Sequence, residues 1–301
     1  MTAQPQALAM PRTRSRWIPR VRAPRKLVIG LSVCAFFLLI AAIGPLLVHN
    51  AAAISADRLA PPSAAHPLGT TNTGQDVLSQ LIVGARGSMT VGLLAGVLII
   101  VLSATVGIAG AMTGGLADEA LSLLSNIFLV LPGLPLVILI TDYIRAQGAL
   151  PIAVIIAITG WAGSSRVIRA QTLSLRRRDY IDAARVTGEP AWRIMLFEVL
   201  PNLAPILASQ FVFAMIGGIL TEAGLAFLGL SNINTVTWGS MLYFAQNAQS
   251  LSLGAWWWFA PPGLCISLVG AALALVNFGL DELINPRLRA ATPVKRKGAR
   301  S

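Results

Sequence analysis

Six long stretches without a charged residue or a histidine most strongly limit what this chain can fold into. At about 1.5 Å of rise per helical residue, crossing a membrane core of about 30 Å takes about 20 residues. The stretches are Leu27 to Val48, Gly87 to Ala117, Ala120 to Thr141, Ala146 to Ser165, Asn202 to Thr221 and Trp256 to Leu280. Because backbone polar groups in lipid must bond to one another, we expect an all-α membrane protein with six transmembrane helices. Only 12% of the 301 residues are charged, against about 25% in soluble domains, which argues against a soluble fold.

Basic residues gather at three places along the chain. Twenty of the 23 lysines and arginines precede the first stretch, lie at 166–193, or follow the last stretch. By the positive-inside rule these regions, and hence both termini, are cytoplasmic. A nucleic-acid surface needs one basic face with interleaved aromatics, so the net charge of +11 does not indicate one.

This topology predicts five regions. They are a basic, disordered cytoplasmic tail (1–26), a first transmembrane helix (27–48), an extracytoplasmic loop (49–85), a core of five helices (86–281) that includes a cytoplasmic loop at about 171–201, and a basic cytoplasmic tail (282–301). The first stretch is 22 residues long, more than the ~7–15 of the apolar region of a signal peptide, so we expect it to remain uncleaved. The connection from Glu222 to Ala255 is expected to be a long outer loop.

The residues that membrane enzymes and ion-driven carriers need are missing from the apolar stretches. Carriers and pumps coupled to ions usually keep ionisable side chains in their spans. The two histidines, His49 and His66, lack the spacing of a zinc protease, and no nucleophile motif occurs. All three lysines lie at the chain ends, so no phosphate-binding loop exists. We expect no catalysis, no metal and no cofactor of its own; powered transport would need an ATPase on another chain.

A polar insert from Asp179 to Pro201 separates the fourth and fifth stretches. A first helix is predicted from Asp179 to about Thr187, ended by Gly188, since glycine best adopts the left-handed conformation after a helix. Pro190 suits the first turn of a second helix, and Pro201 predicts a break before the fifth span. From the residues alone, both a docking surface for a partner and an ordinary amphipathic interfacial helix remain open.

The insert resembles the "EAA" loop of ABC importer permeases, in which Glu-Ala-Ala is followed by a glycine and then by Leu-Pro. Here the matching residues are Asp182, Ala183, Ala184, Gly188, Leu200 and Pro201, with aspartate in place of the usual glutamate. In that family the loop forms a coupling helix seated in a groove of the cytoplasmic ATPase. The resemblance therefore implies that these six residues couple the chain to an ATPase.

Further segments are similar to the C-type permease subunit of dipeptide, oligopeptide and nickel importers. They lie at 66–86, 221–230, 237–241, 257–263 and 285–289, and Gln75 stands where an arginine is common. This resemblance implies the type I importer permease fold in the bacterial inner membrane. It also implies a homologous permease partner, two ATPase subunits or domains that bind ATP and magnesium, and an extracytoplasmic binding protein.

The expected function is import of di- or oligopeptides by such a permease subunit. Import of nickel or another small solute is the alternative, because specificity resides largely in the binding protein. An ion-coupled secondary transporter and a structural membrane scaffold are the alternatives from other classes. Glycines four apart, at Gly92 and Gly96 and at Gly110 and Gly114, predict close helix packing within the subunit rather than a pore lining.

Overall fold

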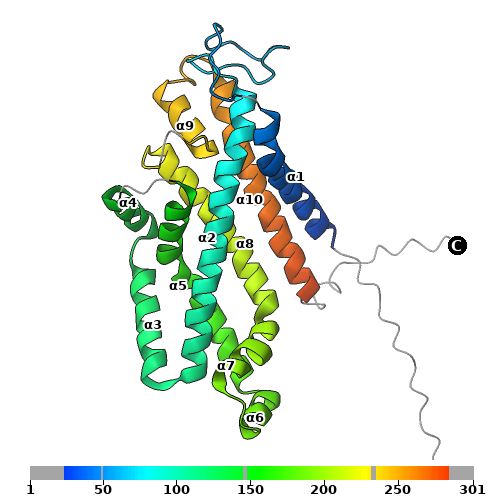
Figure 1. Cartoon of the computed structure of the whole chain (residues 1–301), viewed down its shortest axis with the longest axis vertical. Helices are drawn as coiled ribbons and strands as arrows, with labels where there is room; N and C mark the ends of the chain where they lie inside the picture. The colour runs from blue at the N-terminus through cyan, green and yellow to red at the C-terminus, as the bar shows by residue number, and fades with distance from the viewer. Residues whose placement is uncertain (1–23, 49, 145–147, 232–234, 285–301) are drawn as a thin grey trace, which may run out of the picture.

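The computed structural model is helical through most of the chain it describes, namely residues 24–48, 50–144, 148–231 and 235–284 (Figure 1). The predictions for residues 1–23 and for the tail from residue 285, including the motif at 285–289, fall outside these ranges. The helices are α1 (Arg25–Leu47), α2 (Val77–Thr113), α3 (Gly115–Val130), α4 (Gly133–Ile144), α5 (Ala149–Arg176), α6 (Asp179–Val186), α7 (Ala191–Arg193), the π-helix η1 (Ile194–Val199), α8 (Leu200–Phe227), α9 (Trp238–Asn247) and α10 (Trp256–Ile284).

Five helical stretches are long and apolar enough to cross a membrane: α1, α2, α5, the continuous stretch Ala191–Phe227, and Trp256–Leu283 of α10. The third apolar stretch is not a straight helix, because α3 and α4 meet at a bend of 90°. Pro132 disfavours helical geometry in the residue before it, and Leu131 is extended, with φ −67° and ψ 133°. Counted as one broken span, α3 and α4 raise the candidate spans to six. The predicted all-α membrane fold is confirmed.

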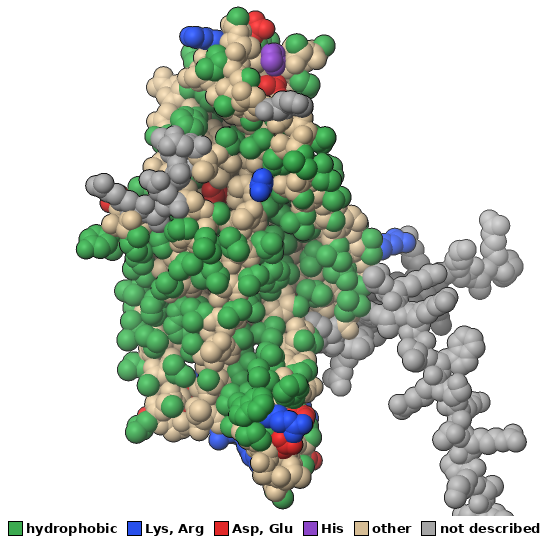
Figure 2. All heavy atoms as spheres, viewed as in Figure 1, with side chains coloured by type: hydrophobic (Ala, Val, Ile, Leu, Met, Phe, Trp, Pro, Cys, Tyr) green, Lys and Arg blue, Asp and Glu red, His purple; other side chains and the backbone are tan. Residues whose placement is uncertain are grey.

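Apolar side chains cover most of the middle of the molecule on the face that Figure 2 shows, and several of the charged side chains in view gather near its two ends. Many large apolar residues of the membrane helices are exposed, among them Phe36 and Leu39 of α1 and Leu264 of α10, each more than half exposed. Such a wide apolar surface is unfavourable in water and matches the hydrocarbon layer of a membrane.

Glycines let the helices approach one another closely. A Cβ at Gly92 of α2 would lie 2.3 Å from Ile219 Cγ1 of α8, and one at Gly218 would lie 2.9 Å from Ala95 Cβ. Gly96 also faces α8, through Met215. The predicted packing role of the first glycine pair within the subunit is therefore confirmed.

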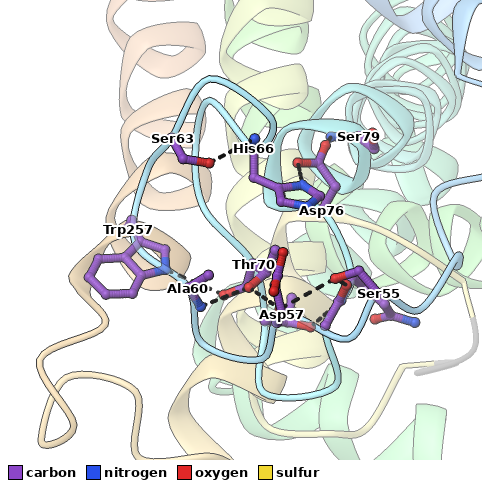
Figure 3. A network of polar contacts seen from close by, with 12 residues as sticks. Ser55, Asp57, Ala60, Ser63, His66, Thr70, Asp76, Ser79 and Trp257 are labelled. Carbon is purple, nitrogen blue, oxygen red and sulfur yellow. Dashed lines mark hydrogen bonds and ion pairs between the residues drawn. The ribbon is translucent and has the colours of Figure 1, made fainter.

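Residues 50–76 fold into a polar cap over one end of the helices (Figure 3). Asp76 is the N-cap of α2, and its Oδ1 lies 3.1 Å from His66 Nδ1. Trp257 Nε1 donates a hydrogen bond to the Thr70 carbonyl oxygen at 3.3 Å. The cap is thereby tied to the starts of both α2 and α10.

The structure corrects the sequence prediction for the connection from Glu222 to Ala255. α8 continues to Phe227, and α9 folds within the connection behind a capping box formed by Thr237 and Ser240. A helix does not end at its first charged residue when that residue finds partners. The helices therefore contain ionisable groups, although the apolar stretches contain none. Helix α8 carries Glu222, and α5 extends past its apolar stretch to carry Arg166 and Arg169.

Candidate functional site: the polar insert and a membrane groove

The polar insert forms the tip of the molecule opposite the cap, where Figure 1 shows α6 and α7. Helix α6 ends as the sequence predicts, with Gly188 in the left-handed region at φ +80°. The Gly188 N–H donates to the Arg185 carbonyl at 3.0 Å and the Glu189 N–H to the Ala184 carbonyl at 3.1 Å, which is the Schellman pattern of a helix C-terminus. These two bonds reverse the chain sharply and set the angle at which α7 leaves.

The six residues expected to couple to an ATPase lie on two elements. Asp182, Ala183 and Gly188 are exposed at or just after α6, and Ala184 is half-buried. Leu200, half-buried, and Pro201, exposed, begin α8 instead. The Asp182 carboxylate accepts a hydrogen bond from Arg185 Nη1 at 3.0 Å on the surface of α6. The structure therefore brings the first four together at the tip and leaves the Leu-Pro pair at the base of the insert.

Buried aliphatic side chains fix the insert to the membrane helices. Ile181 of α6, Ile194 and Val199 of η1 are each at most 3% exposed. They pack in one cluster with Ile108 of α2 and Ile168 of α5. The tip is therefore packed directly against α2 and α5 through this cluster.

The outer surface of the insert is unusually apolar for a region rich in arginine. Val186 is 88% exposed, Phe197 64% and Trp192 59%. A cavity of about 180 Å³ lies between α6 and the following helix, and its lining includes Ala184, Phe197 and both partners of the Glu189–Arg193 ion pair. Phe197 lies beside this depression, whereas Trp192 lines a separate apolar groove with α2. An exposed aromatic side chain beside a depression with charged groups at its rim is typical of a protein docking surface.

The predicted break at Pro201 is wrong. Leu200 is helical, with φ −57° and ψ −44°, and Ala191–Phe227 is continuous. The Leu200 N–H donates to the Met195 carbonyl five residues back, as in a π-helix. The wider turn changes the hydrogen-bond register just before Pro201. The helix therefore continues although Pro201 has no N–H to donate.

A groove of about 440 Å³ opens along the membrane helices α2, α4, α5 and α8. The described residues that line it have apolar or uncharged polar side chains, and none of them is ionisable. The lining residues are Ile99, Gly133, Leu134, Val137, Ile156, Thr159, Gly160, Gly163, Ser164, Val167, Gln210, Phe213, Ala214, Gly217 and Thr221. The bend between α3 and α4 contributes to this shape, because it places the start of α4 at the groove.

Sequence reasoning missed one buried polar contact, which joins α2, α8 and α9. Glu222, 1% exposed, accepts a hydrogen bond through Oε2 from Ser88 Oγ at 3.3 Å. Ser88 Oγ in turn accepts from the Trp238 N–H at 3.1 Å, and the Trp238 indole donates to the Leu81 carbonyl. The only signal in the sequence was an acid directly beside an apolar stretch.

Comparison with known proteins agrees with this architecture. Residues 96–290 match the family model described as the binding-protein-dependent transport system inner membrane component. The chain is 30% identical to the dipeptide transport system permease protein DppC of Bacillus subtilis, over 92% of this chain and 86% of the relative. It is 29% identical to the oligopeptide transport system permease protein OppC of the same organism, over 90% and 88%. It is also 32% identical to the OppC of Mycobacterium bovis, over 77% and 79%.

The matched region runs from the middle of α2 beyond the end of α10, so it contains the groove, the polar insert and Glu222, whereas Ser88, the partner of Glu222, precedes it. The family is a component of the inner membrane, which agrees with the candidate spans. Its transport depends on a binding protein, and the chain contributes the membrane-embedded, non-catalytic part of the importer. The chain therefore belongs to the family of inner membrane permeases of binding-protein-dependent ABC importers.

Proposed function

We propose that this chain forms one half of the transmembrane pathway of an ATP-driven importer of di- or oligopeptides. The observation that carries the peptide assignment is the similarity, over about nine tenths of the chain, to dipeptide and oligopeptide permeases. The groove supports it, since peptides differ in side-chain charge and a neutral wall with hydroxyl and amide groups, such as Thr159 and Gln210, favours none of them.

The other half of the pathway is a homologous permease that faces the groove. The open wall of α5 and α8 that carries Gly163 and Gly217 has space in front of it, because a Cβ added at either glycine meets no atom within 4 Å. A second subunit placed against this wall would close the groove into a channel. The substrate would then pass between two neutral surfaces.

The polar insert is the contact with the cytoplasmic ATPases. Asp182, Ala183, Ala184 and Gly188 form its tip, and Leu200 and Pro201 connect it to α8. ATP binding draws two ATPase subunits together and moves both inserts, and the aliphatic cluster around Ile181 passes that movement to α2 and α5. The pathway changes from inward-facing to outward-facing, and the binding protein delivers the peptide from outside.

Uptake measurements test the assignment. A strain lacking this gene is compared with one that carries it on a plasmid, together with the permease, ATPases and binding protein of the same operon. Uptake of a labelled dipeptide and of a labelled pentapeptide should depend on the gene and persist when an ionophore collapses the ion gradients. Gene-dependent uptake of Ni²⁺ without peptide uptake would exclude the peptide assignment, and loss of uptake with the ionophore alone would indicate an ion-coupled carrier.

A further inference from the structure

A small polar cavity lies between α3 and α5, near the end of the molecule that carries the insert. Its volume is about 110 Å³. A single water molecule needs roughly 10–15 Å³, so the cavity can hold a larger group. Most of its lining consists of hydrogen-bonding side chains. These are Ser122, Ser125, Asn126, Ser165, Arg166 and Arg169.

The cavity has excess positive charge. Arg169 is neutralised by Asp118, to which it donates two hydrogen bonds of 2.6 and 2.7 Å. Arg166 is exposed and makes no hydrogen bond or ion pair with any residue in the described ranges. Among the described residues no acidic side chain lines the cavity, and Asp118, in the first turn of α3, is already paired with Arg169. The Arg166 guanidinium is therefore available to an anion that approaches the hydroxyl and amide groups of the cavity.

The position of the cavity indicates which class of anion would bind in it. Arg166 lies three residues, or about 4.5 Å along the helix, deeper than Arg169, and Asp118 lies in the first turn of α3. The arginine-rich end of the molecule is the cytoplasmic one by the positive-inside rule, and the cytoplasmic leaflet carries anionic lipids. Arg166 directly follows the apolar stretch that ends at Ser165, so it lies at the cytoplasmic end of that span, where phosphate headgroups are expected.

The cavity is separate from the groove. On α5 the groove is lined by Gly163, Ser164 and Val167, whereas the cavity is lined by Ser165, Arg166 and Arg169. At 100° per residue these two sets point to opposite sides of the helix. Helix α3, which forms the other wall, buries only Ser125 among its residues and so turns most of its surface to lipid.

We propose that this cavity binds the phosphate of an anionic phospholipid from the cytoplasmic leaflet. The Arg166 guanidinium, a planar donor well matched to phosphate oxygens, supplies the charge. The hydroxyl of Ser122 and the amide of Asn126 donate hydrogen bonds from α3. The lipid thereby links α3 to α5. Within the described residues, the Asp118–Arg169 pair is the one ion pair that joins these two helices directly.

Native mass spectrometry of the complete purified transporter tests the proposal, with phosphatidylglycerol and phosphatidylcholine added in detergent. The wild type should retain phosphatidylglycerol in preference. Arg166→Gln should lower that retention about tenfold, the factor for loss of one charge-assisted hydrogen bond. Arg177→Gln, which removes the same charge from an exposed site at the end of the same helix, should leave it unchanged. Equal retention in the Arg166 variant and the wild type, or no preference over phosphatidylcholine, would overturn the proposal.

Two further arms complete the test. Excess inorganic phosphate should not displace the lipid, and displacement would mean that the site takes free phosphate instead. If the Arg166 variant does not assemble, Asn126→Leu takes its place, because it keeps both arginines and fills the cavity with an apolar group. That variant should also lose phosphatidylglycerol, and full retention would contradict the proposed site.

Discussion

Arg169 on α5 holds Asp118 on α3 through two parallel hydrogen bonds, from Nε to Oδ1 at 2.6 Å and from Nη2 to Oδ2 at 2.7 Å. The two side chains are 31% and 16% exposed, so the pair is partly shielded from water. Arg169→Gln should lower the free energy of unfolding by about 1–3 kcal/mol, because a carboxylate loses its charged partner.

A double-variant cycle checks that the two residues act together. Thermal unfolding of the purified transporter is measured for Arg169→Gln, Asp118→Asn and the combination. The combination should cost less than the sum of the single changes, since it leaves no unpaired charge. Strict additivity, within about 0.5 kcal/mol, would show that the pair contributes little.

Gly188 gives the second prediction. Its φ of +80° disfavours any side chain with a Cβ, and most strongly a β-branched one, although no atom lies within 4 Å of the added Cβ. Gly188→Val should therefore shift the turn between α6 and α7 and abolish both peptide uptake and its stimulation of ATP hydrolysis, with membrane insertion intact. Gly188→Asn is the matched control, because asparagine tolerates this conformation.

The measurement is substrate-stimulated ATP turnover and uptake in proteoliposomes. The valine variant should lose most of both, whereas the asparagine variant should keep them. Normal turnover and uptake in the valine variant would mean that the geometry of this turn does not transmit force.

The sequence predicted the membrane helices well because an uncharged stretch of about 20 residues has few stable conformations other than a membrane helix. The effect of a proline was harder to predict, and the break predicted at Pro201 is absent. Pro132 bends its span by 90°, whereas Pro201, Pro205, Pro261 and Pro262 lie within continuous helices. A proline leaves one carbonyl of the preceding turn without its helical hydrogen bond, and the helix continues where neighbouring groups satisfy that carbonyl. Groups that are neighbours only in space cannot be identified from the sequence around the proline.

The same distinction applies to the site. The end of α6 at Gly188 is a local property and was predicted. The burial of Ile181 against α2 and α5, and the burial of Glu222 against Ser88, depend on contacts between distant segments. No pattern within one segment indicates them.

The groove gives the third prediction. Gly163→Leu would place a side chain in the groove without a clash, because no atom lies within 4 Å of the added Cβ. Peptide uptake should fall at least about tenfold, while the thermal stability stays near that of the wild type or rises slightly from the gain in helix propensity. Gly270→Leu on α10 is the control, since that position is equally open and lies outside the groove. Equal uptake in both variants would place the pathway elsewhere.

Ser88 gives the fourth prediction, because it links three helices through one hydroxyl. Ser88→Ala removes the donor to Glu222 Oε2 and the acceptor of the Trp238 N–H, and both groups are buried. The loss should cost about 1–3 kcal/mol of unfolding free energy and loosen the start of α9. Ser267→Ala is the control, since Ser267 is exposed and bonds only to the Gly263 carbonyl in its own helix.

Thermal unfolding of the purified transporter measures the stability, and hydrogen exchange of the α9 backbone measures the local opening. Faster exchange in α9 with Ser88→Ala alone supports the link, whereas identical exchange in the two variants would mean that α9 is held by its apolar contacts with α8 and not by this hydroxyl.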